Sequence, residues 1–251
     1  RGLGDVYKRQ SMNRPEVMNA LNTQMRAEIT DAYKRLAAQA RVIVLTGRGK
    51  AFCSGQDLGD RANAAQLDLE RTLKDEYEPM LRAIIECQIP TITALNGAAA
   101  GAGANLALAS DVVIAAKSSY FMQAFTKIGL IPDAGGTYLM PRTTGLAKAM
   151  GAALFAEKIS AERADEWGLI WEAVADDAFE ATWRARAEYL AKGPTLAYSH
   201  LKTALRASSE NNLEAQLALE AKLQKECGNS RDFKEGVLAF LEKRTAHFEG
   251  R

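Results

Sequence analysis

The chain has 251 residues, 47% of them hydrophobic and 25% charged, and its formal net charge is +1. This length is ample for one large domain, and so balanced a charge gives no electrostatic reason to expect a nucleic acid or an anionic membrane as partner. Cys53, Cys87 and Cys227 form no CxxC pair, so they predict no disulfide framework and no metal site and favour a cytoplasmic location. No apolar run approaches the roughly 18 residues of a membrane-spanning helix.

The first ten residues, RGLGDVYKRQ, differ in character from the rest of the chain. They do not resemble a signal peptide, which needs an apolar central stretch. The string DVYKRQ resembles translated sequencing-adapter DNA. We therefore expect residues 1–10 to be non-native and to stand in place of a genuine first strand, and we leave them out of the predicted fold.

Apolar residues at three- and four-residue spacing predict a helix over 18–40. Runs rich in β-branched residues predict buried strands at 41–47, 91–97 and 111–116, with a helix around 73–85 and another over the small residues 98–110. Beyond these, one possible strand at 169–175 interrupts a helical region, whose expected helices span 143–155, 160–167, 177–191, 194–207, 211–227 and 231–243. The alternation predicts an α/β fold with a largely parallel sheet, as a core over 11–190 and a helical region over 191–251.

Two glycine-containing loops, 47–60 and 96–110, follow the first two strands. Ligands usually bind beyond the carboxyl ends of parallel strands, so both loops point to one site. Free backbone N–H groups near Ala102, at a helix start, would stabilise developing negative charge. The alternative is that the small residues only permit close helix packing. The sequence has no dinucleotide-binding fingerprint and no Walker-type GK[ST], so no nucleotide cofactor is predicted.

The segment KIGLIPDAGGTYLMPR (127–142) places Asp133 between Ile131-Pro132 and two glycines. Desolvation in so apolar a context raises the pKa of a carboxyl and makes it a stronger base. The alternative is that Asp133 caps the helix that follows it.

Three ordered motifs, AFCSGQDL (51–58), NGAAAGAGANLALASDVVIAA (96–116) and IGLIPDAGGTYLMPR (128–142), resemble the enoyl-CoA hydratase/isomerase (crotonase) family. NRPEVMNALN (13–22) and DFKEGVLAFLEKR (232–244) add to the resemblance. It implies a crotonase-like spiral of ββα turns with a C-terminal helical trimerisation region. It also implies acyl-CoA thioester substrates, in which coenzyme A is part of the substrate rather than a cofactor, and homotrimers or dimers of trimers.

The same resemblance assigns residues to a site. The backbone amides of Gln56 and Ala102 would form an oxyanion hole, and backbone donors would leave both side chains free to vary. The residues implied to bind the acyl-CoA are Glu16, Val17, Ser54, Asp57, Leu58, Phe125, Phe240 and Lys243. Phe240 and Lys243 match positions that reach coenzyme A in some members from a neighbouring subunit, with ordinary helix packing as the alternative.

The departures from the family pattern point to the chemistry. Hydratases of the family carry two glutamates, at positions that align with Asn105 and Phe125, and neither residue here can take a proton from water. Asp133 stands where hydratases usually have glycine and isomerases have their carboxylate, and the Asn105 amide would face the acyl pocket to orient substrate or a water.

The sequences of these motifs are most similar to those of the family members that isomerise ring-1,2-epoxyphenylacetyl-CoA in phenylacetate catabolism. The systematic name of this thioester is 2-(1,2-epoxy-1,2-dihydrophenyl)acetyl-CoA. We therefore expect an acyl-CoA isomerase that acts on this epoxide, on β,γ-unsaturated thioesters, or on both, with Asp133 as proton shuttle. Two alternatives are an enoyl-CoA hydratase that uses one carboxylate and a non-catalytic CoA- or RNA-binding trimer. The near-neutral charge disfavours RNA, because phosphate contacts need clustered Lys and Arg.

Overall fold

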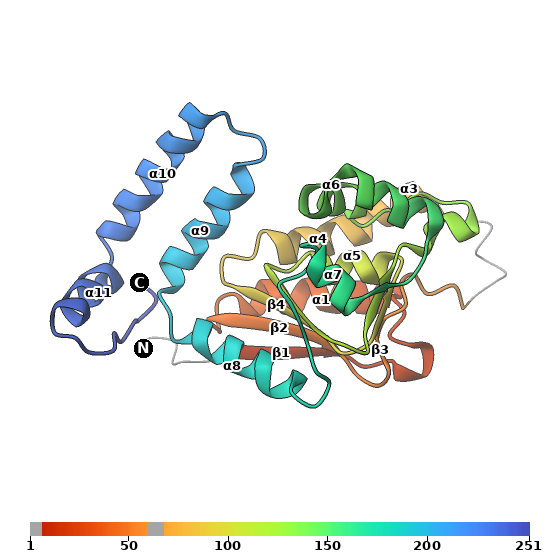
Figure 1. The fold of residues 1–251 in the computed structure, drawn as a ribbon, viewed down its shortest axis with the longest axis horizontal. Helices are drawn as coiled ribbons and strands as arrows, with labels where there is room; N and C mark the ends of the chain where they lie inside the picture. The colour runs from red at the N-terminus through yellow and green to blue at the C-terminus, as the bar shows by residue number, and fades with distance from the viewer. Residues whose placement is uncertain (1–6, 60–67) are drawn as a thin grey trace.

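Two sheets form the core of the chain, which a computed structural model describes over residues 7–59 and 68–251 (Figure 1). The larger sheet has the order β1-β2-β4-β6-β9 with all neighbours parallel, and the smaller has the order β3-β5-β7-β8 with an antiparallel last pair. The strands are β1 (Tyr7–Met12), β2 (Val42–Gly47), β3 (Ala51–Cys53), β4 (Thr91–Leu95), β5 (Ala98–Ala100), β6 (Val112–Ala116), β7 (Tyr120–Met122), β8 (Ile159–Ser160) and β9 (Glu172–Val174).

In each of the pairs β2/β3, β4/β5 and β6/β7 the first strand belongs to the larger sheet and the second to the smaller, and a helical segment follows, as α5 (Ala102–Leu108) follows β5. This is the predicted crotonase-like spiral of ββα turns, so the α/β prediction is confirmed. The prediction of a helix from residue 98 is wrong, because Ala98–Ala100 form β5. β5 lies between β3 and β7, and its hydrogen bonds to both neighbours override the helix propensity of alanine.

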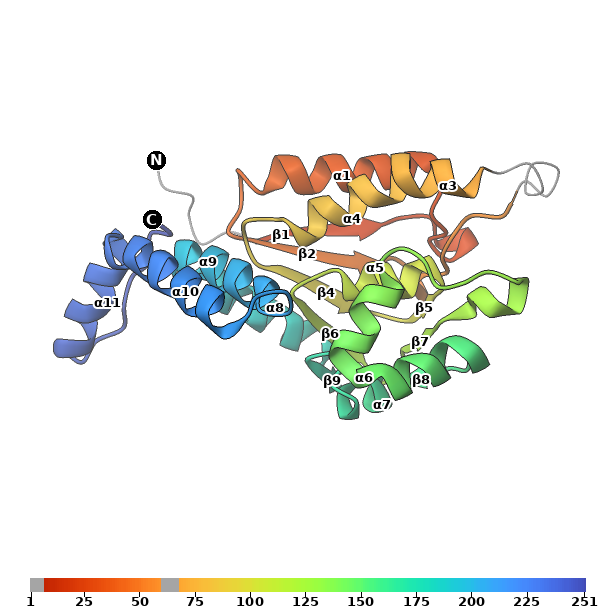
Figure 2. The same ribbon diagram turned by 90° about the horizontal axis from the view of Figure 1, so that it is seen from above.

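Helices cover both faces of the larger sheet (Figure 2). In β2 the side chains of Val42 and Val44 pack with Trp183 and Ala187 of α8, whereas Ile43 and its neighbours join the core under the helices of the other face. Apolar residues on both faces explain the continuous apolar runs of these strands. The remaining helical segments of the core are η1 (Pro15–Val17), α1 (Thr23–Leu36), α3 (Leu69–Thr72), η2 (Leu73–Tyr77), α4 (Glu78–Ile85), η3 (Ala124–Ile128), α6 (Gly136–Phe155), α7 (Ala161–Glu166) and α8 (Phe179–Ala191).

Helix α1 begins five residues later than the predicted residue 18. Met18 and Asn19 have φ angles of 52° and 55°, which a right-handed helix does not allow. The helix begins once the Asn22 side chain accepts a hydrogen bond from the Met25 N–H at 2.9 Å. The residues before it therefore form a loop that packs against β3, not a helix.

Residues 7–10 form most of β1, which pairs in parallel with β2 from Tyr7 opposite Val42 to Met12 opposite Gly47. Leaving residues 7–10 out of the fold was wrong for this reason. Residues 1–6 lie outside the described residues, and the non-native origin of the segment stays a prediction.

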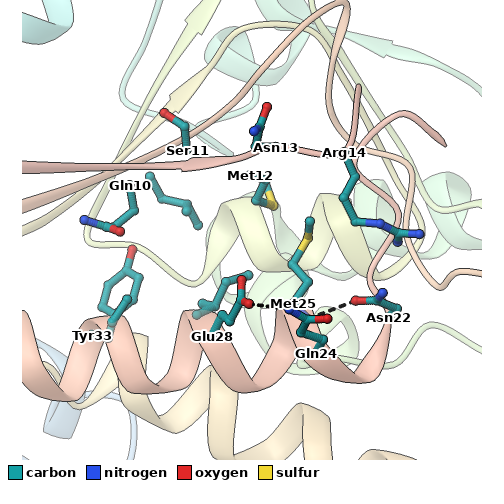
Figure 3. Close-up of a pocket in the computed structure, with 13 residues that line it drawn as sticks. Gln10, Ser11, Met12, Asn13, Arg14, Asn22, Gln24, Met25, Glu28 and Tyr33 are labelled. Atoms are coloured by element: carbon teal, nitrogen blue, oxygen red, sulfur yellow. Dashed lines mark hydrogen bonds between the residues drawn. The ribbon is translucent and has the colours of Figure 1, made fainter. Parts of the chain in front are cut away.

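A cavity of about 460 Å³ opens between β1 and α1 (Figure 3). β1 turns Gln10 toward α1, beside Tyr33, where neighbouring positions such as Met12 and Met25 are buried and apolar. A glutamine fills such a sheet–helix interface poorly because its amide loses water on burial. The lining of the cavity includes none of the residues predicted for catalysis.

The chain ends in a helical arm made of α9 (Thr195–Ala207), α10 (Leu213–Gly228) and α11 (Arg231–Leu241). In both views the arm extends away from the sheets, with α9 and α10 antiparallel (Figures 1 and 2). It exposes large apolar side chains, namely Leu201, Leu205, Leu213, Leu217, Phe233, Val237, Leu238, Phe240 and Leu241. Within residues 7–59 and 68–251, every helix is too short or too polar to cross a membrane.

Candidate active site

The loop after β3 lies directly against the start of α5. Gly55 has φ +98°, and a Cβ atom there would stand 2.8 Å from the Ala100 oxygen and 3.4 Å from the Ala102 nitrogen. Gly101, the residue before the helix, has φ +53°. The two glycines thus provide conformations that side chains disfavour and bring residue 56 close to residue 102.

The backbone N–H groups of Gln56 and Ala102 are available at this junction. On either side of Gln56, Leu21 N–H donates to Gly55 O at 2.7 Å and Asp57 N–H donates to Leu21 O at 3.1 Å. The Gln56 N–H itself donates to no acceptor among the described residues, and neither does Ala102 N–H, which as the first helical residue lacks an intrahelical partner. Two free amides side by side are suited to hold a carbonyl oxygen that gains negative charge.

Asp133 is a desolvated carboxyl next to α6. Burial raises its pKa to about 6, and its Oδ1 is buried with no hydrogen-bond partner among the described residues. α6 begins after Gly135, which provides no side-chain cap, so the alternative that Asp133 caps this helix is wrong. A carboxylate that neither caps a helix nor pairs with a cation is free to exchange a proton.

Asn105 connects Asp133 to the start of α5. It is fully buried, and its Nδ2 donates to the Asp133 carbonyl at 2.7 Å while its Oδ1 accepts from Gln123 Nε2 at 2.8 Å. A Cβ atom at Gly136 would collide with the Asn105 amide, so α6 approaches α5 closely here. Asn105 therefore holds the Asp133 backbone in place, which differs from the expectation that it orients substrate or water in the acyl pocket.

Phe125 occupies the other position where hydratases carry a glutamate. It lies on η3, is 6% exposed, and its ring is 3.9 Å from the point where a Cβ of Gly101 would be. It thus forms an apolar wall beside the amide of Ala102. Of the three positions where family members carry catalytic carboxylates, this chain has a carboxylate at Asp133 alone.

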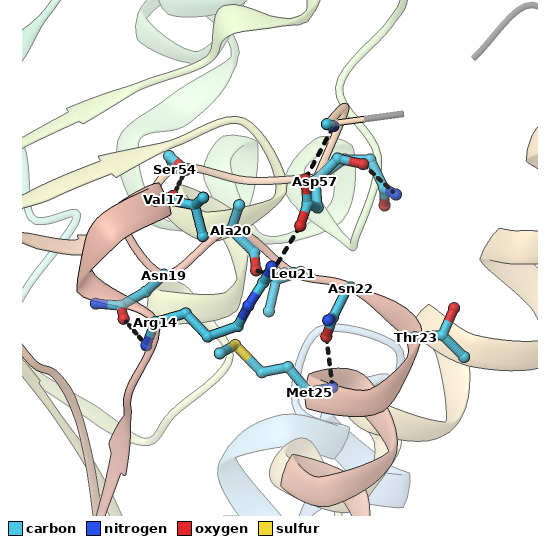
Figure 4. A network of polar contacts seen from close by, with 12 residues as sticks. Arg14, Val17, Asn19, Ala20, Leu21, Asn22, Thr23, Met25, Ser54 and Asp57 are labelled. Carbon is cyan, nitrogen blue, oxygen red and sulfur yellow. Dashed lines mark hydrogen bonds and ion pairs between the residues drawn. The ribbon is translucent and has the colours of Figure 1, made fainter. Parts of the chain in front are cut away.

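Several of the residues predicted to bind the acyl-CoA, among them Val17, Ser54 and Asp57, lie close together (Figure 4). Ser54 Oγ donates to Val17 O at 3.3 Å, which joins the loop after β3 to the exposed η1 that also carries Glu16. Arg14 Nη1 donates to Asp57 Oδ2 at 2.8 Å, and this guanidinium holds the pKa of Asp57 below its usual range. Leu58, the next residue, is 51% exposed.

Phe240 and Lys243 do not join this surface. Phe240 lies on α11 and Lys243 follows that helix. In both views α11 lies in the arm, far from α5 (Figures 1 and 2). Phe240 is 83% exposed. Their predicted contact with coenzyme A therefore requires a second copy of the chain.

Two residues at the site were missed from the sequence, Arg26 and Tyr77. Tyr77 Oη donates to Gln56 Oε1 at 2.6 Å, and Arg26 Nη1 donates to the same oxygen at 2.9 Å. A signal existed for both, because each polar group lies on the apolar face of its helix, where it needs a partner. The spacing that predicts the helix does not tell which partner that is.

The chain is similar in sequence and in fold to proteins of one family. The family model for enoyl-CoA hydratase/isomerase matches residues 9–251. A Rhodobacter capsulatus protein named "probable enoyl-CoA hydratase" is 64% identical over 96% of this chain and 93% of its own length. The 1,2-epoxyphenylacetyl-CoA isomerase of Escherichia coli is 44% identical over 96% of this chain and 94% of its own.

Solved structures agree with the sequence matches. The enoyl-CoA hydratase of Bacillus anthracis superposes with a TM-score of 0.90 at 31% identity, over 97% of this chain and 95% of the other. An enoyl-CoA hydratase/isomerase structure from Mycobacterium abscessus gives 0.92 at 36% identity, over the same shares of the two chains. Together with the paired amides and the desolvated Asp133, these matches show that the chain belongs to the enoyl-CoA hydratase/isomerase family.

Proposed function

We propose that the chain is an acyl-CoA isomerase in which Asp133 alone removes and returns the proton. The observation that carries the proposal is the Asp133 carboxyl itself, with a pKa raised to about 6 by burial and an Oδ1 without a partner among the described residues. A base with a pKa near the operating pH can both accept a proton and give it back. Asn105 and Phe125 offer no second carboxylate to activate a water.

The reaction follows from these groups. The acyl carbonyl oxygen of a β,γ-unsaturated thioester accepts hydrogen bonds from the N–H groups of Gln56 and Ala102, which stabilise the enolate that forms when Asp133 removes a proton from the α-carbon. The protonated Asp133 then returns the proton to the γ-carbon, and the double bond moves to the α,β position. No atom is gained or lost, so one carboxylate is sufficient.

The acyl group that we propose is 2-(1,2-epoxy-1,2-dihydrophenyl)acetyl, as in phenylacetate catabolism, with β,γ-enoyl thioesters as further substrates. Support comes from the 44% identity to the epoxyphenylacetyl-CoA isomerase and from the apolar wall that Phe125 forms beside the oxyanion amides. The first step is the same for the epoxide, because its acidic proton also lies next to the thioester carbonyl.

A hydratase that works with one carboxylate is the second candidate. It is favoured by the name of the relative that is 64% identical and by the 2,3-dehydroadipyl-CoA hydratase of Escherichia coli, which is 35% identical over 96% of this chain. In that reaction Asp133 would activate a water for attack on the β-carbon, with the same oxyanion amides.

A product assay distinguishes the two candidates. The purified protein is given a 3-enoyl-CoA, the ring epoxide of phenylacetyl-CoA and a trans-2-enoyl-CoA, and products are followed by ultraviolet absorbance and mass spectrometry. An isomerase converts the first two at high turnover and adds little water to the third. Rapid formation of 3-hydroxyacyl-CoA together with no isomerised product would contradict the proposal.

We also infer that the chain assembles as a homotrimer or a dimer of trimers. The helical arm exposes nine large apolar side chains, between Leu201 and Leu241, and clustered exposed apolar side chains mark protein–protein contacts. Assembly would also give Phe240 and Lys243 a second copy whose site they can reach. Light scattering at micromolar concentration tests this inference, and the mass of a monomer would contradict it.

A further inference from the structure

Arg26 is a buried cation on the apolar face of α1. It is 2% exposed, and its Nε and Nη2 donate to Glu76 Oε2 at 3.0 and 2.6 Å. Its Nη1 donates to the Leu21 carbonyl at 2.7 Å and to Gln56 Oε1 at 2.9 Å. A buried guanidinium is tolerated only where its donors are used, so these contacts fix Arg26 in one orientation.

Tyr77 binds the same glutamine oxygen, next to Arg26. It ends η2, a π-helical segment, and such wider turns occur frequently at functional sites. Its hydroxyl donates to Gln56 Oε1 at 2.6 Å, and burial raises the pKa of Tyr77, which keeps the hydroxyl protonated as a donor. The Arg26 guanidinium lies 4.7 Å from the centre of the Tyr77 ring.

These contacts surround the peptide that carries the Gln56 N–H. Leu21 N–H binds Gly55 O on one side of it, and Asp57 N–H binds Leu21 O on the other. Arg26 also donates to Leu21 O, so one guanidinium holds both the side chain of Gln56 and the residue Leu21 that is bridged to it. A rotation of the peptide between Gly55 and Gln56 would break the bond from Leu21 N–H to Gly55 O, and the contacts of the Gln56 side chain hold the Cα atom to which this peptide is attached.

We propose that Arg26 and Tyr77 are positioning residues of the oxyanion hole, which fix the direction of the Gln56 N–H through the Gln56 side chain. The inference rests on the proposed function, because it takes this N–H as a donor to the enolate oxygen. It also revises the expectation that the side chain at residue 56 is free to vary. A glutamine, or another acceptor of similar length, is required there.

Matched variants separate the acceptor from the backbone. Gln56→Met keeps the length of the side chain and the backbone N–H but removes the acceptor, whereas Gln56→Glu retains an acceptor for Arg26 and Tyr77. We expect Gln56→Met to lower kcat for isomerisation roughly tenfold to a hundredfold with little change in KM, since one donor of an oxyanion hole is misdirected. Gln56→Glu should recover most of the loss, and Tyr77→Phe, which removes one donor, should lower kcat less.

The carbonyl stretching frequency of a bound thioester reports the strength of the hydrogen bonds in the oxyanion hole without any turnover. The probe is butyryl-CoA labelled with an isotope at the thioester carbonyl, observed by infrared difference spectroscopy. Hydrogen bonds from Gln56 and Ala102 lower this frequency when butyryl-CoA binds to the wild type. In Gln56→Met and Tyr77→Phe we expect it to move back toward the free value while butyryl-CoA still binds.

These measurements distinguish a failure of the positioning role from a failure of the proposed function. Unchanged frequency and kcat in folded Tyr77→Phe and Gln56→Met overturn the positioning role and leave the isomerase proposal intact. If Gln56→Met does not fold, Tyr77→Phe decides by the same two measurements. A wild type that binds butyryl-CoA without any lowering of the frequency has no oxyanion hole at Gln56 and overturns both proposals.

Discussion

Replacing Asp133 by asparagine should lower activity and should change the pH dependence of stability. A carboxyl whose pKa rises from 3.8 in the unfolded chain to about 6 in the folded protein destabilises the fold once it is ionised. Between these two pH values the folded state keeps a proton that the unfolded chain has lost. The penalty therefore grows as pH rises from about 4 to about 6 and is complete above that.

The size of this penalty follows from the two pKa values. At about 1.4 kcal/mol for each pH unit, it amounts to at most about 3 kcal/mol, since Asp133 keeps some contact with water. Asparagine has no such penalty, although its own amide needs partners at any pH. The stability of Asp133→Asn relative to wild type should therefore improve with rising pH, by an amount that does not depend on the cost of the amide.

Urea denaturation at about pH 4 and about pH 7 measures this difference. In parallel, isomerisation of a 3-enoyl-CoA, followed by absorbance of the conjugated product, should fall roughly 10²–10⁴-fold, as for a positioned acid–base group. A folded Asp133→Asn protein with full isomerase activity would refute the role of Asp133 as the base. A stability difference that does not vary with pH would refute the reasoning from burial.

Asp57→Asn is the matched control. Arg14 lowers the pKa of Asp57, so the Asp57 carboxylate contributes stability above its unfolded pKa, and this contribution is lost as pH falls. The control should therefore be less stable than wild type near neutral pH, and the deficit should shrink in acid. The two asparagine variants thus have opposite pH dependences, which a general effect of removing a negative charge does not produce.

Three further predictions follow from the site and the edge strand. The kcat/KM of the wild type should rise with pH through about 6, where Asp133 loses its proton, and a flat profile from pH 5 to 8 would exclude it as the base. Gly136→Ala should lower both activity and melting temperature because its methyl group displaces Asn105, whereas Gly151→Ala, with open space in the same helix, should stabilise by about 0.5–1 kcal/mol. Gln10→Leu should raise the melting temperature by a few degrees, about 2–4 °C per kcal/mol, because it places apolar atoms instead of an amide beside α1, and a lower melting temperature would contradict this reasoning.

The long elements of the fold could be predicted from the sequence. The run 41–47 is continuously apolar and rich in β-branched residues, as a strand that packs on both faces requires. The helices of the arm have the three- and four-residue spacing of helices that pack on one face. The strands of the smaller sheet could not, because β3, β5 and β7 have three residues each. Their conformation comes from pairing with strands distant in the sequence. Local propensity does not reveal this pairing, as the three alanines of β5 show.

The site was predictable where a family motif fixes it. The motifs placed Gln56, Ala102 and Asp133, and the structure brings the first two together and desolvates the third. The role of Asn105 was not predictable, since its partner, the Asp133 carbonyl, lies 28 residues away in the sequence. The same holds for Tyr77, whose spacing predicted its place on a helix but not its bond to Gln56.

The central claim is that one carboxylate moves a proton from one carbon of the substrate to another. The most direct test follows deuterium placed on the α-carbon of a β,γ-enoyl-CoA and locates it in the product by mass spectrometry and NMR. Asp133 is partly shielded from water, so we expect part of the label to appear on the γ-carbon of the α,β-enoyl product. A product formed at full rate with no label on the γ-carbon, or a 3-hydroxyacyl-CoA in its place, would contradict it.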